Sequence, residues 1–145
     1  MMIALLDNIR SLHNVGSMFR TADGAGVAKL YLCGYTGTPP RREIAKVALG
    51  AEDSVPWEYR KDIRRLIVRL KKEGWTIVAL EQTEKSIAYT SMTLDPCLRG
   101  DDDKKIALIV GNEVEGISPK TLVLADITLH IPMRGVKESL NVFRR

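Results

Sequence analysis

MIALLDNIRSLHNVGSMFRTADGAGVAKLYLC, residues 2–33, is the stretch that decides the fold. Its two ends, residues 2–6 and 29–33, are short apolar runs of the kind that form buried β-strands. A helix is predicted between them over residues 14–24, and its apolar face consists of Val15, Met18, Phe19 and Ala22. A strand, a helix and a strand in this order predict two parallel neighbouring strands joined by a crossover helix.

The same alternation continues to residue 131. Three further strands are predicted at residues 75–80, 106–110 and 127–131. Three further helices are predicted at residues 42–49, 60–72 and 119–124, the last of them capped by Ser118. We therefore expect an α/β fold in which a mostly parallel sheet carries helices on both faces. No linker, repeat or low-complexity segment divides the sequence, so residues 1–145 are expected to form a single domain.

Composition argues against membrane-spanning, exported and disulfide-rich proteins. The chain has 145 residues, of which 45% are hydrophobic and 28% charged, as in ordinary globular proteins. The longest uncharged run, residues 30–40, is far shorter than the roughly 20 apolar residues of a membrane-spanning helix. Residues 1–6 meet Asp7 without a basic lead, unlike a signal peptide. Cys33 and Cys97 are too few for a disulfide framework or a zinc site. We expect a cytoplasmic protein with no membrane contact.

Positive charge is concentrated in one segment. The formal net charge is +4, and residues 60–72 contain seven lysines and arginines against a single carboxylate, Asp62. The apolar residues of this segment recur at helical spacing, which places the cations on the opposite face of an amphipathic helix. Such a face either keeps a core helix soluble or binds the phosphates of a polyanion. In the second interpretation Arg64, Arg65 and Arg69 are RNA-binding residues.

Three polar loops follow three of the predicted strands, where α/β proteins bind their ligands. They read NVGSMFRTA at residues 14–22, GNEVEGIS at residues 111–118 and IPMRGVKESLNV at residues 131–142. Taken singly, each is also compatible with an ordinary structural role: a solvated helix face, a turn into a capped helix, and a rigid loop.

In this order and at these positions, the three loops resemble the signature motifs of the SpoU/TrmH family of RNA 2′-O-ribose methyltransferases, in the SPOUT superfamily. The segment TPPRREIAKVALGA, residues 38–51, is also similar to family sequence. The resemblance implies an α/β knot, a deep trefoil knot, that binds S-adenosylmethionine as methyl donor without a metal. It also implies a homodimer acting on tRNA or rRNA. Many relatives carry a separate RNA-binding domain, for which this chain has no counterpart.

The resemblance also assigns roles to individual residues. The donor pocket is expected to consist of Leu80, Gly111, Ile131, Met133 and Leu140. Arg20 matches the arginine that helps to activate the ribose 2′-hydroxyl, and it is therefore both a catalytic and an RNA-binding candidate. The polar residues expected to position the arginine, the substrate and the knot loops are Asn14, Glu113, Ser139 and Asn141.

The chemistry of the reaction restricts what Arg20 can do. A neutral hydroxyl is a poor nucleophile, so methyl transfer needs proton removal or strong hydrogen bonding to that hydroxyl. A guanidinium is normally fully protonated and is a poor general base. We therefore expect Arg20 to orient the hydroxyl and to stabilise the negative charge that develops on it.

Two other functions compete with this interpretation. One is a knot-fold RNA-binding protein or subunit with weak or no transfer activity. The other is a nucleotide-dependent oxidoreductase, which α/β alternation alone would allow. The second is disfavoured because no GxGxxG motif follows the first predicted strand, and Gly24-Ala25-Gly26 precedes a strand instead.

The C-terminal motif departs from the family pattern. In the family, the SLNV segment begins a helix that completes the knot, covers the donor and packs in the homodimer. In this sequence only three residues follow Val142, which is less than one helical turn. We expect the 145-residue chain to dimerise and bind donor weakly and to regain both properties when such a helix is appended.

Overall fold

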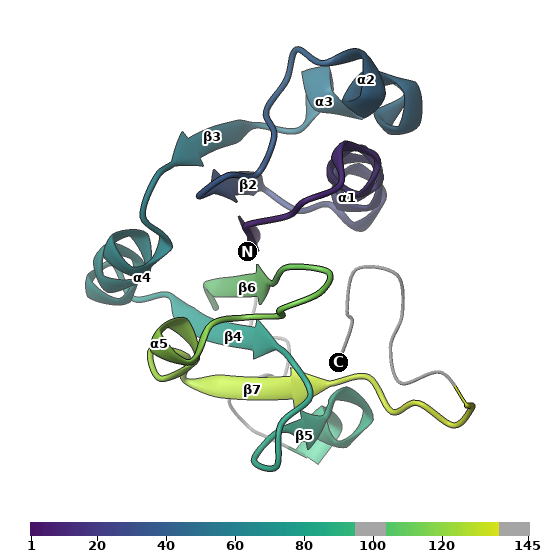
Figure 1. Ribbon diagram of the computed structural model, residues 1–145. Coiled ribbons are helices and arrows are strands. Elements are labelled where there is room, and N and C mark those ends of the chain that lie inside the picture. Colours follow the sequence, from purple (N-terminus) through teal and green to yellow (C-terminus); the bar gives the residue numbers. More distant parts are fainter. Residues whose placement is uncertain (95–103, 137–145) are drawn as a thin grey trace.

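The computed structural model describes residues 1–94 and 104–136, and its centre is a seven-stranded sheet (Figure 1). The strands are β1 (Met2–Asp7), β2 (Lys29–Cys33), β3 (Trp57–Arg60), β4 (Thr76–Leu80), β5 (Ile87–Ala88), β6 (Ile106–Val110) and β7 (Ile127–His130). Their order across the sheet is β3-β2-β1-β6-β4-β7-β5, and each pair of neighbours is parallel. The predicted parallel sheet is confirmed.

Helices cover both faces of the sheet, as predicted. The helices are α1 (Leu12–Ala25), α2 (Arg42–Ala48), α3 (Ala51–Ser54), α4 (Ile63–Lys72), the 3-10 helix η1 (Tyr89–Leu94) and α5 (Pro119–Leu122). One cluster of buried side chains packs α1, α2 and α3 against one face of strands β1, β2 and β6. A second cluster joins α4 and α5 to the alternate residues of β1 and β2 and to residues of β4 and β6. Successive side chains along a strand point to opposite faces of the sheet, so they pack into two cores, one on each face.

Two predicted helix starts were wrong. Helix α1 begins at Leu12 rather than at Asn14, because the Ser11 hydroxyl caps it and accepts a hydrogen bond from the Asn14 backbone nitrogen at 3.2 Å. Helix α4 begins at Ile63 rather than at Arg60. Its cap is Asp62, and Arg60 belongs to the preceding strand.

Four elements were missed: β3, α3, β5 and η1. Strand β3 has the sequence WEYR and lies at the edge of the sheet, where its side chains are half-buried or exposed. Strand β5 has only two residues and lies at the opposite edge. Edge strands bury little side-chain area, so their sequences lack the apolar run by which central strands are recognised.

The strand ends that precede the three motif loops lie side by side. Leu6 of β1 is paired with Val110 of β6, Val110 with Leu80 of β4, and Leu80 with Leu129 of β7. Because all four strands are parallel, the loops that follow them emerge at the same end of the sheet, beyond the carboxyl ends of the strands. The predicted knot depends on residues 137–145, which lie outside the described residues, so it stays a prediction. Among the helices of the described segments, none is long and apolar enough to cross a membrane.

Candidate functional site

Glu113 joins the loops after β6 and β1. Its Oε1 accepts hydrogen bonds from the Asn14 side-chain amide at 2.9 Å and from the Ser11 backbone nitrogen at 3.0 Å. Its Oε2 accepts one from the Arg10 backbone nitrogen at 2.8 Å. The motif residues Asn14 and Glu113, 99 positions apart in the sequence, are thus brought into direct contact.

These hydrogen bonds keep the Glu113 carboxylate charged despite its burial. Burial alone raises the pKa of the Glu113 carboxyl, but the hydrogen bonds from Ser11, Arg10 and Asn14 lower it, and the net pKa lies below the usual value. A buried carboxylate that accepts several N–H groups is a rigid anchor. Glu113 therefore fixes the start of α1 against the sheet.

Arg20 lies two turns further along α1 on its exposed side. Its guanidinium forms no hydrogen bond or ion pair with the described residues. The structure therefore presents Arg20 to solvent from a helix whose first turn is held by Glu113. Arg20 therefore forms no hydrogen bond or ion pair with Asn14 or Glu113. The catalytic role of Arg20 stays a prediction.

The loop of the second motif is tightly folded. A side chain at Gly111 would approach the backbone of Gly116 and Ile117 to 2.6 Å, so only glycine fits there. The Asn112 carbonyl side-chain oxygen accepts hydrogen bonds from the backbone of the next turn, at 2.8 and 2.9 Å. Its amide nitrogen donates to the Asn8 carbonyl at 2.8 Å and to the Tyr35 hydroxyl at 2.6 Å. The loop is thereby tied to the end of β1.

The predicted donor residues meet at neighbouring strand ends. Leu80 ends β4, Gly111 follows β6, and Ile131 and Met133 follow β7. Leu80, Ile131 and Met133 are each partly exposed, whereas Gly111 is buried. The structure thus brings these four residues to neighbouring strand ends, where three of them are apolar and partly exposed. The remaining predicted residues of this region, Ser139, Leu140 and Asn141, lie outside the described residues.

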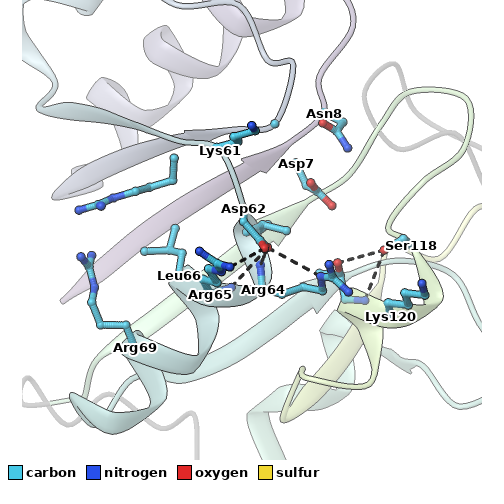
Figure 2. A pocket seen from close by; sticks show the side chains of 14 residues that line it. Asp7, Asn8, Lys61, Asp62, Arg64, Arg65, Leu66, Arg69, Ser118 and Lys120 are labelled. Carbon is cyan, nitrogen blue, oxygen red and sulfur yellow. Dashed lines mark hydrogen bonds and ion pairs between the residues drawn. The ribbon is translucent and has the colours of Figure 1, made fainter.

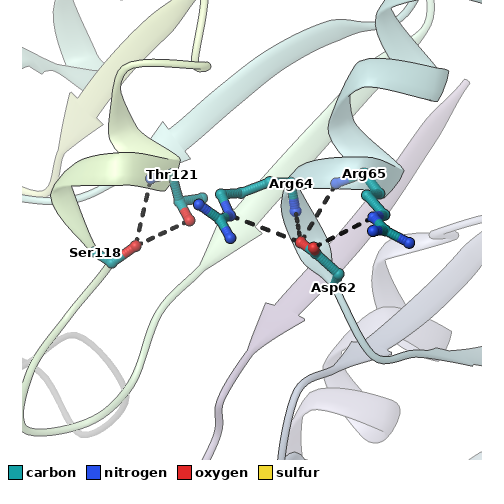
Figure 3. A network of polar contacts seen from close by, with 5 residues as sticks. All are labelled: Asp62, Arg64, Arg65, Ser118 and Thr121. Carbon is teal, nitrogen blue, oxygen red and sulfur yellow. Dashed lines mark hydrogen bonds and ion pairs between the residues drawn. The ribbon is translucent and has the colours of Figure 1, made fainter.

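The three predicted RNA-binding arginines of α4 lie on the other face of the sheet from α1. Figure 3 shows that Asp62 caps α4 through the backbone nitrogens of Arg64 and Arg65, at 2.9 and 3.4 Å. The side chains of Arg64 and Arg65 also pair with Asp62, each at 3.7 Å. Arg69 donates to the Tyr31 hydroxyl at 3.3 Å and pairs with Glu73 at 3.6 Å. Arg64 and Arg65 remain exposed, so their charge is available to a ligand.

Comparisons with known proteins identify the family. The sequence matches the SpoU rRNA Methylase family over residues 1–144. The chain belongs to the SpoU methylase family. The resemblance that the motifs suggested is thereby confirmed, and within the SpoU family the parallel sheet is the expected architecture.

Individual SpoU relatives are similar along almost the whole chain. A tRNA (guanosine(18)-2'-O)-methyltransferase of Aquifex aeolicus (strain VF5) is 31% identical in an alignment that covers 97% of this chain and 63% of the relative. The crystal structure of the A. aeolicus TrmH/SpoU tRNA modifying enzyme matches with a TM-score of 0.81 at 30% identity, covering 97% of this chain and 67% of that one. An AdoMet-bound rRNA methyltransferase from Sinorhizobium meliloti matches with a TM-score of 0.81 at 26% identity, covering 97% and 51%. The chain thus spans less than two thirds of the first relative's length.

Several residues of the candidate site were not predicted from the sequence. Asn112 lies beside the predicted Gly111 and Glu113, and its position inside the motif was the signal that could have found it. Glu81 follows the predicted Leu80 and accepts a hydrogen bond from the Ile117 backbone nitrogen at 2.9 Å. No sequence pattern pointed to Tyr35, because only the folded structure brings its hydroxyl within hydrogen-bonding distance of Asn112. Within the described residues, no cluster of histidines, cysteines and carboxylates could hold a metal ion.

Proposed function

We propose that this chain transfers a methyl group from S-adenosylmethionine to a ribose 2′-hydroxyl of tRNA or rRNA. The observation that carries the proposal is the Glu113–Asn14 hydrogen bond, which unites two family motifs beside the apolar strand ends. The relatives named above support the substrate class, since one is a tRNA 2′-O-methyltransferase and another an rRNA methyltransferase.

The residues at the strand ends fit the donor. Leu80, Ile131 and Met133 offer partly exposed apolar surface for an adenine ring. When bound, S-adenosylmethionine supplies a methyl group made electrophilic by its sulfonium. The Sinorhizobium meliloti relative, whose structure contains AdoMet, supports this choice of donor.

The protein's own contribution is positioning. Glu113 and Asn14 hold the first turn of α1, and the rigid helix carries Arg20. The Arg20 guanidinium orients the ribose hydroxyl and stabilises its developing negative charge, while a neighbouring RNA phosphate takes the proton. Holding the hydroxyl in line with the methyl group supplies a large share of the rate acceleration.

The same proposal includes the RNA contacts, the oligomeric state and the C-terminal motif residues. Arg64, Arg65 and Arg69 contact RNA phosphates, in keeping with the exposed positive charge of α4. The chain acts as a homodimer in the cytoplasm without a metal, and Ser139, Leu140 and Asn141 contribute to the donor site and the knot. These points rest on the family resemblance and on composition.

The test is methyl transfer to unmodified RNA by the Arg20→Ala variant. We expect its transfer rate to fall by about 100-fold or more, because removing one preorganised charge donor at a reacting oxygen costs that much. Donor affinity, measured by calorimetric titration, should remain unchanged.

The matched control is Arg42→Ala, which removes an exposed arginine of α2 and should leave the rate unchanged. Full transfer by Arg20→Ala would overturn the assignment of Arg20. Donor binding without any methyl transfer by the wild type would instead indicate an RNA-binding protein.

A further inference from the structure

A basic cleft lies beyond the ends of β1 and β2, on the face of the sheet that carries α4 and α5. Its volume is about 870 Å³. Figure 2 shows that it is enclosed by the end of β1, the start of α4 and the start of α5. The predicted donor residues Leu80, Gly111, Ile131 and Met133 are not among its lining residues. This cleft is therefore separate from the apolar strand ends described above.

Positive charge dominates the lining. Six cationic side chains contribute to it: Arg60, Lys61, Arg64, Arg65, Arg69 and Lys120. Only two carboxylates do so, Asp7 and Asp62, and Asp62 is engaged in capping α4. Lys61 and Lys120 are exposed and form no ion pair with the described residues. The excess of cations attracts phosphate groups.

Asp7 makes this cleft different from a simple anion site. Its residue is only 6% exposed, and its carboxylate forms no hydrogen bond or ion pair with the described residues. In Figure 2 the carboxylate points into the cleft, between the starts of α4 and α5. Burial raises the pKa of Asp7 to about 6, which is the expected result for a carboxyl without a partner. The Asp7 carboxylate lines the cleft, so a ligand bound there can donate a hydrogen bond to it.

We propose that this cleft binds a ribonucleotide unit, with its phosphate on the arginines of α4 and a ribose hydroxyl or base N–H donating to Asp7. A bare phosphate would be repelled by the Asp7 carboxylate. A nucleotide joins an anion to hydrogen-bond donors and satisfies both parts of the lining.

The size and place of the cleft agree with this ligand. Clefts of about 300–1,000 Å³ are usual for small-molecule sites. The chain also changes its winding direction here. From β1 it runs through α1 outward to β2 and β3, and then α4 carries it across the opposite face to β4, on the other side of β1. Such switch points in open parallel sheets are where nucleotides bind, often through a carboxylate that accepts from the ribose.

The nucleotide can come from two sources, a free mononucleotide or one residue of an RNA strand. The second source would deepen the RNA interface proposed above, and in that part the inference rests on the proposed function. The shared chemistry is tested first by calorimetric titration of the wild type with AMP, GMP, CMP and UMP, and with inorganic phosphate as reference. We expect at least one mononucleotide to bind about 10-fold or more tightly than phosphate. Equal affinity for phosphate, or no binding of any mononucleotide at millimolar concentration, would overturn the proposal.

Variants then locate the bound nucleotide. Arg64→Ala with Arg65→Ala should weaken mononucleotide binding about 10-fold or more, and Asp7→Leu should do the same without weakening phosphate binding. If Asp7→Leu does not fold, Asp7→Ala removes the same acceptor and should weaken mononucleotide binding alike, whereas Asp7→Asn keeps one acceptor oxygen and should retain most of the binding. The matched control, Arg41→Ala with Arg42→Ala, removes two exposed arginines on the opposite face and should change nothing. Unchanged nucleotide binding in the cleft variants would overturn the assignment.

A tetraribonucleotide distinguishes the two sources. If it binds more tightly than the mononucleotides and is weakened by the same variants, the cleft holds one residue of an RNA strand. If it binds no more tightly, the natural ligand is a free nucleotide. None of these readouts uses methyl transfer or the methyl donor. Nucleotide binding without transfer would therefore refute the proposed function alone, and transfer without nucleotide binding would refute the cleft alone.

Discussion

Two buried carboxyls close to the end of β1 experience opposite environments. Glu113 accepts three hydrogen bonds from the β1–α1 region, whereas the carboxylate of Asp7 accepts none from the described residues. The pKa of Glu113 is accordingly lowered by these bonds against the opposing effect of burial, while burial raises the pKa of Asp7 to about 6. Desolvation favours the neutral acid, and N–H donors favour the carboxylate.

The two carboxyls should therefore affect stability with opposite dependence on pH. Glu113 stabilises the fold above its unfolded pKa, near 4.5, and loses that effect as pH falls through its lower folded pKa. Glu113→Gln should cost about 1–3 kcal/mol of unfolding free energy at pH 7, because one donor loses its acceptor, and less below pH of about 4.

Asp7 has the reverse sign. Its folded pKa of about 6 exceeds the ordinary 3.8, so the stability present in its protonated form is lost as pH rises between these values. At about 1.36 kcal/mol per pKa unit the loss is on the order of 3 kcal/mol. Asp7→Asn should thus become more stable than the wild type as pH rises from about 4 to 7. Urea unfolding across this range measures both variants, and two pH-independent differences would contradict the contrast.

At the scale of elements, the packing of α1 on α2 depends on one glycine. A Cβ atom at Gly16 would lie 2.5 Å from the Ile44 carbonyl oxygen and 3.0 Å from Val47 Cβ. Both contacts belong to α2, so the two helices must separate to accept any side chain. We expect Gly16→Ala to destabilise the protein by about 1–3 kcal/mol, the usual cost of overpacking.

Gly24 supplies the matched control on the same helix. A Cβ atom at Gly24 would meet nothing within 4 Å. Gly24→Ala should stabilise the protein by up to about 1 kcal/mol, since alanine favours the helix more than glycine does. Guanidinium unfolding followed by circular dichroism compares the two variants. A Gly16→Ala protein as stable as Gly24→Ala would show that α2 yields at little cost.

Sequence patterns predicted the elements of the centre and missed those at the edges. Strands β1, β2, β4 and β6 contain buried apolar residues in runs, and α1 and α4 have clear apolar faces. Edge strand β3 and the two-residue β5 lack such runs, because their side chains are half-buried or exposed at the edges of the sheet. The family motifs gave Asn14 and Glu113 as candidate residues, but their hydrogen bond to each other followed only from the structure. The positions of Asp7 and Tyr35 followed only from the folded arrangement of distant segments.

At the scale of the whole molecule, the sheet separates the two surfaces for which we propose a role in RNA binding. Helix α1, with Arg20 on its exposed side, covers one face, and α4 with its arginines covers the other. The end of β1 joins them, because Asn8 lines the basic cleft and its carbonyl also accepts the Asn112 amide at 2.8 Å. An RNA strand that reaches both surfaces must therefore pass over the carboxyl end of β1.

That arrangement predicts which charges control the salt dependence of RNA binding. Reversal of the three arginines of α4, by Arg64→Glu, Arg65→Glu and Arg69→Glu together, removes their phosphate contacts. For a single-stranded RNA each lost contact reduces the slope of log K against log salt by about 0.7, so the slope should flatten by about 2. Filter binding between low and high salt measures it.

The control reverses an equal charge on the opposite face, through Arg41→Glu, Arg42→Glu and Lys46→Glu at exposed positions around α2. Both triple variants change the net charge equally, so a long-range effect of net charge alone would flatten both slopes alike. A local phosphate interface on α4 flattens only the first. If the α4 variant keeps the wild-type slope, the arginines of this helix serve only to keep it solvated. If both variants flatten equally, RNA is attracted by the charge of the whole molecule and not by the α4 face.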